Sequence, residues 1–227
     1  MSYLVTGTDT GVGKTLISCA LMHAFADRGR RVVGMKPVAA GCDEDGHNED
    51  VKQLRAAGNI LASYGQINPY TFYRPIAPHI AARITGVTID FARILTSFRE
   101  LSSQADEVIV EGIGGFKVPL NEKQDSAELA QQLKLPVIMV VGMRLGCLNH
   151  ALLTADSISA HGLILAGWVA NILDAEMPAL QDNIGALKQR LNSPLLGVVE
   201  YQKSPDAREA ATQLNIGFLR TNVPENA

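Results

Sequence analysis

Short hydrophobic runs alternate along the chain with longer segments in which hydrophobic and polar residues recur at helical spacing. The hydrophobic runs cover residues 3–5, 31–35, 107–110, 136–141, 163–169 and 195–199. The helical segments cover residues 14–28, 48–57, 91–102, 126–133, 148–160, 175–191 and 206–214. Runs that are hydrophobic on both faces suit a parallel sheet buried between helices. The alternation therefore predicts an α/β fold with a doubly wound, mostly parallel sheet flanked by helices.

The 227 residues are enough for one α/β domain with a substantial core, and no internal repeat divides them. We therefore expect a single domain over residues 1–227. Residues 42–49 are polar and predict a loop, whereas residues 67–81, with three prolines, predict an ordered insertion. Ligands of doubly wound folds bind beyond the carboxyl ends of the strands, so we expect the chemistry directly after each hydrophobic run.

The first hydrophobic run leads into Gly7-Thr8-Asp9-Thr10-Gly11-Val12-Gly13-Lys14-Thr15, which opens a helical segment. The Walker A pattern needs glycine where Thr8 stands, but its Gly-Lys-Thr end is intact. Glycines let successive N–H groups point at an anion, and the helix N-terminus adds positive charge. Lys14 would neutralise phosphate charge and the Thr15 hydroxyl would ligate Mg²⁺. A glycine-rich turn is the alternative, but the agreement of strand, loop and helix favours a P-loop NTPase fold.

Three charged residues near later element boundaries are candidates for the same site. Glu111 ends the third run before a glycine turn, as a Walker B carboxylate that holds Mg²⁺ does, or as a structural acid. Lys36 follows the second run, and chemistry alone does not decide between a phosphate ligand and a surface lysine. Asp50 lies near the start of a helical segment. It is either a metal ligand or an acid stabilised by the helix dipole, and its position alone favours the second interpretation.

Two further loops follow later hydrophobic runs. The stretch 144–150 precedes a helix whose unpaired N–H groups can bind a carboxylate. Within it, Cys147 is expected to be a small packing residue, because a thiol without a nearby base stays protonated. Asn171 offers a donor and an acceptor to a purine. Ile172 stands where a guanine site of the N-K-x-D type needs lysine, which favours adenine.

Composition narrows the range of partners. The net charge is −3 and the pI about 5.9, with Lys and Arg scattered, so we expect no nucleic-acid partner. Three cysteines without a C-x-x-C pair favour a reducing, cytoplasmic setting over a disulfide framework. No hydrophobic run is long enough to cross a bilayer and no signal peptide precedes the first strand, so we expect no membrane partner.

Seven segments together resemble the dethiobiotin synthetase family, in the family's order and over nearly the whole chain. They are the glycine loop with Asp9 and Thr10, Lys36-Pro37-Val38-Ala39, Asn68-Pro69-Tyr70, Pro78-His79, Val110-Glu111-Gly112 with Gly114-Gly115, Gly146-Cys147-Leu148-Asn149-His150, and Gly167-Trp168-Val169-Ala170-Asn171. The family belongs to the P-loop branch that includes partition and cell-division ATPases. Those relatives usually carry a signature lysine where Asp9 stands here, which points away from them.

The resemblance implies an ATP-dependent ligase that makes dethiobiotin from 7,8-diaminopelargonate, CO₂ and ATP in biotin biosynthesis, with ADP and phosphate as the other products. In the family a substrate amine captures CO₂ as a carbamate, which takes the γ-phosphoryl group to form a carbamic–phosphoric anhydride. The second amine then closes the ring. Because ATP supplies the leaving group, the protein needs positioning and charge neutralisation rather than a covalent nucleophile.

The resemblance also implies residue roles. Catalytic roles fall to Thr10, Lys14 and Lys36, and Mg²⁺ binding falls to Thr15, Asp50 and Glu111. The residues expected to bind substrate are Lys36, Ala40, Gly146, Cys147, Leu148 and Asn149, the last from the partner subunit of a homodimer. The residues expected to contact ATP are Gly11, Val12, Gly13, Lys14, Thr15, Leu16, Asp50, Glu111, Gly112, Gly114, Asn171, Ile172, Glu200, Tyr201, Gln202 and Asp206.

Some positions depart from the family pattern, and two other functions remain alternatives. Ala40 replaces a common serine, Gly11 a loop acid and Asn183 a tyrosine, which bears on substrate affinity more than on the reaction. Another ATP-dependent ligase of the branch would usually carry a glutaminase domain, for which 227 residues leave no room. A partition-type ATPase switch is disfavoured by Asp9. We also expect Lys36→Gln to lower turnover and to leave the fold intact, since a strand-end lysine is not core.

Overall fold

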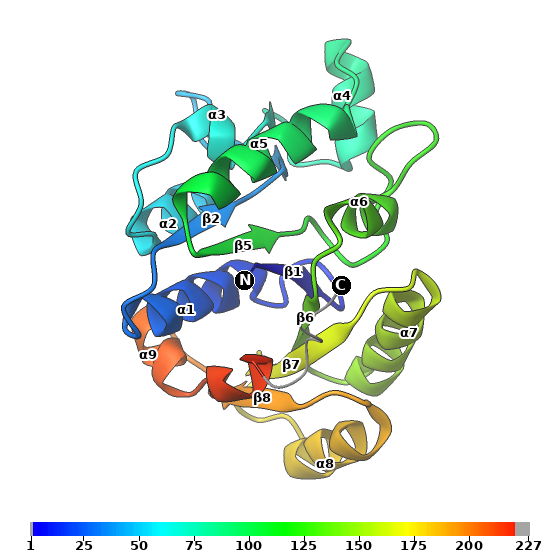
Figure 1. Ribbon diagram of the computed structural model, residues 1–227. Helices are drawn as coiled ribbons and strands as arrows, with labels where there is room; N and C mark the ends of the chain where they lie inside the picture. Colours follow the sequence, from blue (N-terminus) through cyan, green and yellow to red (C-terminus); the bar gives the residue numbers. More distant parts are fainter. Residues whose placement is uncertain (1, 221–227) are drawn as a thin grey trace.

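A six-stranded sheet forms the centre of the computed structural model, which describes residues 2–220 (Figure 1). Its order is β2-β5-β1-β6-β7-β8, and every pairing between these strands is parallel. The strands are β1 (Tyr3–Gly7), β2 (Val32–Met35), β5 (Glu107–Glu111), β6 (Val137–Met143), β7 (Leu165–Ile172) and β8 (Leu195–Val199). The predicted doubly wound sheet is confirmed. Residue 1 and residues 221–227 of the predicted domain lie outside the described residues.

Helices cover both faces of this sheet because the buried strand residues alternate between the two sides. Ile109 packs with the core beneath α1 (Lys14–Ala26), whereas Val108 and Val110 pack with the core beneath α5 (Phe91–Gln104). Figure 1 shows α1 and α9 on one side of the strands and α6, α7 and α8 on the other. The remaining bounds are α2 (Glu49–Ala57), α6 (Ser126–Leu133), α7 (Cys147–Ala160), α8 (Leu180–Arg190) and α9 (Ala207–Thr212).

Four short elements between β2 and α5 were not predicted. They are β3 (Val38–Ala40), β4 (Tyr70–Phe72), α3 (Tyr64–Ile67) and α4 (Pro78–Thr85), with β3 and β4 paired in parallel as a second sheet. Of these, β4 and the first part of α4 lie in the predicted ordered insertion, residues 67–81. A 3₁₀ helix at Ile216–Arg220 was also not predicted. The predicted start of a helix at residue 175 was wrong, since α8 begins at Leu180. Ala179 has a left-handed φ of 53°, which a right-handed helix does not allow.

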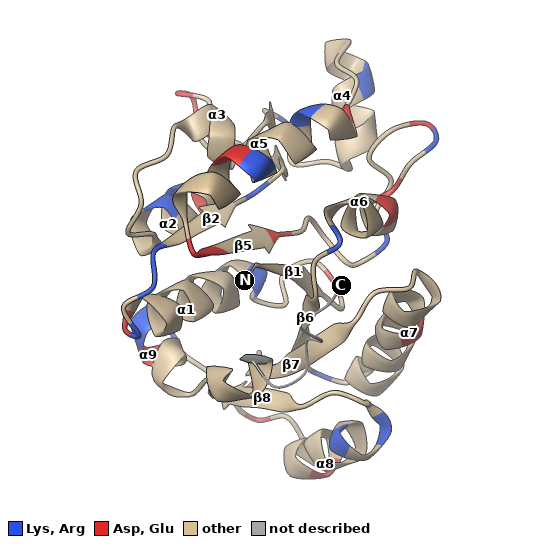
Figure 2. Ribbon diagram, viewed as in Figure 1, with Lys and Arg blue, Asp and Glu red and all other residues tan. Residues whose placement is uncertain are grey.

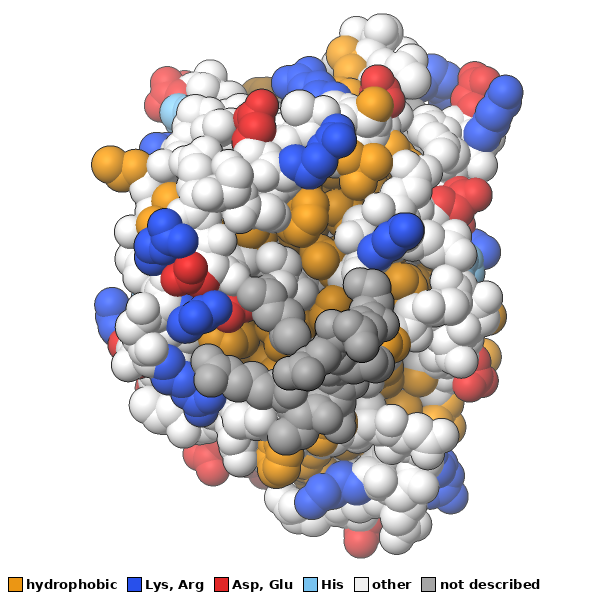
Figure 3. Space-filling view, in the orientation of Figure 1, with side chains coloured by type: hydrophobic (Ala, Val, Ile, Leu, Met, Phe, Trp, Pro, Cys, Tyr) orange, Lys and Arg blue, Asp and Glu red, His pale blue; other side chains and the backbone are white. Residues whose placement is uncertain are grey.

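Charged residues of both signs are spread over the surface. Figure 2 shows Lys and Arg interspersed with Asp and Glu, and the face in Figure 3 carries side chains of both signs among hydrophobic ones. Among the described residues, no helix is both long enough and hydrophobic enough to cross a membrane.

Candidate active site

Two glycines with left-handed backbone shape the loop between β1 and α1. Gly11 has a φ of 72° and Gly13 a φ of 91°, values that favour glycine. A Cβ at Gly13 would also collide with the side-chain nitrogen of Asn171. Between the two glycines, Val12 is buried against Gly142, where an added Cβ would lie 2.8 Å from its Cγ1. The loop therefore packs closely on Asn171 and Gly142, while its backbone at Gly11 stays exposed.

Lys14 begins α1, and its side chain folds back over this loop. Its Nζ donates a hydrogen bond to the carbonyl oxygen of Asp9 at 2.9 Å. Burial, followed by the like charge of Lys36, lowers the pKa of Lys14 from 10.5 to about 8. A bound phosphate would favour the charged ammonium and raise this pKa again.

Four residues predicted for the site converge around one ammonium group. Lys36 Nζ lies 2.6 Å from Glu111 Oε1 and 2.9 Å from Asp50 Oδ2, and it donates to the carbonyl oxygen of Gly112 at 3.2 Å. Thr15 Oγ1 donates to the same Glu111 oxygen at 2.9 Å. The residues meet because β5 lies between β1 and β2, so the loops after these strands share one edge. The cluster adjoins the glycine loop through Thr15.

Lys36 is a buried cation rather than a surface lysine. Its exposed fraction is 3%, so the expectation that it lies outside the core was wrong. Burial opposes its charge, but Glu111 and Asp50 outweigh that cost and raise the pKa of Lys36. Burial likewise opposes ionisation of Asp50, and Lys36 outweighs it, so the pKa of Asp50 is lowered. Lys36 is therefore protonated at neutral pH, and a substitution there would leave buried charge unpaired.

The oxygen atoms of this cluster have the chemistry of a Mg²⁺ site. The second carboxylate oxygen of Glu111, Oε2, is buried and has no hydrogen-bond partner among residues 2–220. Mg²⁺ prefers carboxylate and hydroxyl oxygens and usually completes its shell with phosphates and water. In the described part of the chain, no group of three or more His, Cys, Asp or Glu side chains is arranged for a metal. Thr15, Asp50 and Glu111 are the donors that fit such a shared site.

Asn171 lies directly beneath the glycine loop. It is in β7 and buried, and its Nδ2 donates to the carbonyl oxygen of Val12 at 2.9 Å. One of its polar atoms thus holds the loop backbone, a contact that the sequence did not predict. Ile172 ends β7 beside it and is half-buried.

The predicted segment after β8 makes mainly local contacts. Asp206 caps α9, accepting from the N–H groups of Arg208 at 2.7 Å and Glu209 at 3.2 Å. Gln202 Oε1 accepts from the N–H of Asp206 at 2.6 Å. Glu200 donates its N–H to Gln213 at 2.9 Å, and Tyr201 is exposed. Because α9 packs on α1, this segment lies on the same side of the sheet as the helix that follows the glycine loop.

At the start of α7, where we predicted a binding site for a carboxylate, one backbone N–H group already has a hydrogen-bond partner. Gly146 precedes the helix with a φ of 95°, and the Cys147 N–H donates to the carbonyl oxygen of Arg144 at 3.0 Å. Cys147 is buried in the core, which confirms its packing role. Leu148 is half-buried and Asn149 exposed. Ala40 ends β3 and is half-buried.

Two residues that we had not assigned to the site also contribute to it. Arg144 forms an ion pair with Asp9, whose Oδ1 also accepts the Thr10 N–H at 2.7 Å. The Thr10 bond, together with Arg144, lowers the pKa of Asp9. Asn68 Nδ2 donates to the carbonyl oxygen of Lys36 at 2.6 Å and orients that segment. Arg144 follows β6 as Lys36 follows β2, and this position was the signal that could have identified it.

The sheet order, the Gly-Lys-Thr loop and the strand-end carboxylate define a P-loop NTPase of the α/β class. A family model described as an AAA domain matches residues 1–209. The MinD cell division protein of Aquifex aeolicus has a similar fold, with a TM-score of 0.59 at 13% identity and 98% of each chain covered. MinD of Pyrococcus horikoshii, solved with Mg-ADP, has a TM-score of 0.50 at 16% identity, with 97% of this chain and 90% of that chain covered.

Sequence relatives are more specific than the fold. The ATP-dependent dethiobiotin synthetase BioD of Nitrosospira multiformis is 56% identical over 217 residues, which cover 96% of each protein. The protein of the same name from Aromatoleum aromaticum is 50% identical over 95% of this chain and 97% of its own length. The chain belongs to the ATP-dependent dethiobiotin synthetase family. It is thus a member of an enzyme family.

Proposed function

We propose that this protein catalyses the ATP-dependent formation of dethiobiotin from 7,8-diaminopelargonate and CO₂ in biotin biosynthesis. The observation that carries the proposal is the convergence of Lys36, Asp50 and Glu111 beside the phosphate loop. Lys36 Nζ lies 2.6 Å from Glu111 and 2.9 Å from Asp50, and Glu111 accepts a hydrogen bond from Thr15 of the loop at 2.9 Å. The family relationship supports the substrate assignment. A site of this kind offers charge neutralisation and no covalent nucleophile, which suits a reaction in which ATP supplies the leaving group.

The reaction balances in three steps. A substrate amine attacks the carbon of CO₂, a C–O π pair moves onto oxygen, and a proton leaves to give a carbamate. A carbamate oxygen attacks the γ-phosphorus of ATP, and ADP departs with the bonding pair, leaving a carbamic–phosphoric anhydride. The second amine attacks the carbonyl carbon, phosphate departs with its bonding pair, and loss of a proton completes the ring.

Lys36 and Lys14 serve these steps as cations. Since Lys36 stays protonated, its role is to neutralise carbamate and phosphate charge rather than to accept a proton. Lys14 would be charged by contact with the phosphates, and the N–H groups of the glycine loop would hold them. Thr10, which is exposed at the mouth of the loop, would orient the reacting oxygens.

Thr15, Asp50 and Glu111 would hold Mg²⁺ with the nucleotide phosphates. The unpartnered Glu111 Oε2 supports this assignment, because a buried carboxylate oxygen without a donor is suited to a cation. When bound, Mg²⁺ supplies neutralisation of charge on the β- and γ-phosphate oxygens. The adenine base would be bound by Asn171 and the segment after β8.

The remaining expectations are part of the same proposal. The carboxylate of the diamine would bind at the start of α7, and exposed Asn149 suits a contact supplied by the partner subunit of a homodimer. We propose one domain for the whole chain and a cytoplasmic location, to which the free thiols Cys19, Cys42 and Cys147 are suited.

A product assay tests the proposal. Purified protein is incubated with diaminopelargonate, bicarbonate, Mg²⁺ and ATP, and dethiobiotin is identified by mass. Phosphate release is followed in parallel, with each component omitted in turn. We expect dethiobiotin and phosphate in equal amounts and only with all components. ATP hydrolysis that is independent of the diamine, without dethiobiotin, would favour a nucleotide-dependent switch instead.

A further inference from the structure

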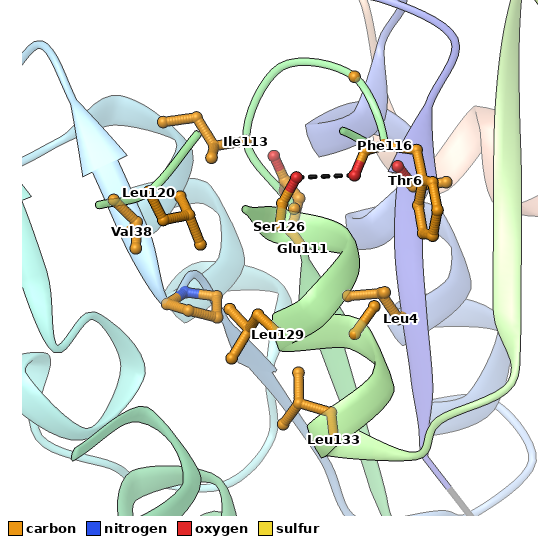
Figure 4. A pocket seen from close by; sticks show the side chains of 14 residues that line it. Leu4, Thr6, Val38, Glu111, Ile113, Phe116, Leu120, Ser126, Leu129 and Leu133 are labelled. Atoms are coloured by element: carbon orange, nitrogen blue, oxygen red, sulfur yellow. Dashed lines mark hydrogen bonds between the residues drawn. The ribbon is translucent and has the colours of Figure 1, made fainter. Parts of the chain in front are cut away.

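A hydrophobic cavity lies between β1, α6 and the loop that follows β5 (Figure 4). It contains about 420 Å³ of empty space, counting its open mouth. Figure 4 shows Leu4 from β1 and Leu129 and Leu133 from α6 around it, with Phe116 on the side of β1 and with Val38 and Leu120 on the opposite side. The hydroxyl of Ser126 at its rim is already engaged, donating to the carbonyl oxygen of Phe116 at 2.7 Å.

One end of this cavity adjoins the Lys36 cluster. Glu111 and Gly112 line the cavity and also bind Lys36 Nζ, at 2.6 and 3.2 Å. Pro37, the residue after Lys36, is a third lining residue. A small molecule that leaves the cavity at this end therefore reaches the place where the proposed carbamate forms and reacts.

The lining restricts what the cavity can hold. A charged or strongly polar molecule would lose its hydration there without regaining hydrogen bonds, which costs several kcal/mol. ATP and bicarbonate, which are anions, are excluded on this ground, and an ammonium group of the diamine could be bound only at the end lined by Glu111. The hydrocarbon chain of the diamine ends in a carboxylate, and among the described residues that line the cavity there is no Lys, Arg or His to pair with it. Cavities with such linings stay dry and bind small apolar molecules and gases.

We propose that this cavity is a binding site for CO₂. CO₂ has no net charge and no dipole. The space that the centre of a water-sized molecule can reach in the cavity is about 30 Å³, which exceeds the roughly 10–15 Å³ that one bound water needs on this measure. The inference rests on the proposed function, which makes CO₂ a substrate. The cavity holds CO₂ beside the site, so that the amine captures it where the γ-phosphate of ATP awaits the carbamate.

Filling the cavity tests the proposal through the KM for CO₂. Ala130 lies on α6, is buried and lines the cavity, so Ala130→Val places two more carbon atoms in it. Ala127→Val is the matched control, because Ala127 is a buried alanine of the same helix that does not line the cavity. Carbonic anhydrase is added to hold CO₂ and bicarbonate at equilibrium. We expect A130V to raise the KM for CO₂ about three- to tenfold and A127V to leave it unchanged.

The KM values for ATP and the diamine separate this site from others. They should stay at the wild-type level in A130V, with kcat recovered at saturating CO₂. A rise in the KM for the diamine instead would assign the cavity to the substrate chain and overturn the proposal, as would an unchanged KM for CO₂. Absence of dethiobiotin from the wild-type protein at every CO₂ concentration would instead refute the proposed function.

Crystals of the wild-type protein pressurised with CO₂ and flash-cooled provide a readout that does not depend on activity or on the folding of a variant. We expect density for a linear molecule between Leu4, Leu129 and Phe116. Density for ordered water, or an empty cavity under CO₂ pressure, would overturn the proposal.

Discussion

Lys36→Gln removes the central cation of the Lys36 cluster and provides the sharpest test of the electrostatics of the site. The ammonium pairs with Glu111, whose side chain is fully buried, and with Asp50, whose side chain is 39% exposed. Gln keeps the approximate length of the side chain and one hydrogen-bond donor group but loses the charge. Two carboxylates are then left facing each other with no cation between them.

The expected loss of stability follows from this geometry. Removing one partner of a buried ion pair costs about 3–5 kcal/mol. Asp50 is partly solvated and Gln can still donate a hydrogen bond, so the lower end, about 3 kcal/mol, applies. One kcal/mol shifts the Tm of a protein of this size by about 2–4 °C, so K36Q should lower Tm by about 6–12 °C.

Thermal unfolding in EDTA and in excess Mg²⁺, followed by circular dichroism, measures this effect. Mg²⁺ should restore part of the lost stability in K36Q, because a divalent cation can take the place of the ammonium between the carboxylates. Lys52→Gln is the matched control. Lys52 pairs with Asp43 at 2.6 Å on the surface, where solvent screens the charges, so this variant should unfold close to the wild-type Tm. A Tm for K36Q in EDTA equal to that of Lys52→Gln would refute the reasoning. Dethiobiotin formation by K36Q should fall strongly.

Two further predictions concern the phosphate loop. Because the pKa of Lys14 falls from 10.5 to about 8 on folding, the folded state binds fewer protons than the unfolded state between these values, and the contribution of Lys14 to stability rises with pH there. ATP favours the charged form of Lys14, so the affinity for ATP should fall above pH 8, approaching a tenfold loss per pH unit. Titration calorimetry should show this fall for the wild type and a flat pH profile for Lys14→Arg, whose guanidinium stays charged. Equal slopes of affinity against pH in the two proteins would contradict the prediction. Gly13→Ala, at a φ of 91°, should cost about 1–3 kcal/mol in denaturant unfolding and abolish ATP binding. Gly185→Ala in α8, with nothing within 4 Å of its added Cβ, should be neutral or stabilising, and equal behaviour of the two would refute the argument.

Several elements followed from local sequence alone because their signals are strong and continuous. The hydrophobic runs located all six strands of the sheet, and α6 was predicted with its observed bounds, since Asp125 caps its start. The Gly-Lys-Thr junction located the phosphate loop, whose glycines have the left-handed backbone that the chemistry requires. In contrast, β3 and β4 are three-residue strands, too short for a hydrophobic period to register.

The contacts of the site depended on the order of the strands, which no local pattern specifies. Lys36 and Glu111 are 75 residues apart, and they meet because β2 pairs with β5. That pairing also buries Lys36, whereas its position at a strand end had led us to expect that it lies outside the core. The sequence by itself thus determined which residue types stand at the strand ends and which family the chain resembles. Only the tertiary structure decided which charges share a desolvated space, because burial and pairing depend on neighbours distant along the chain.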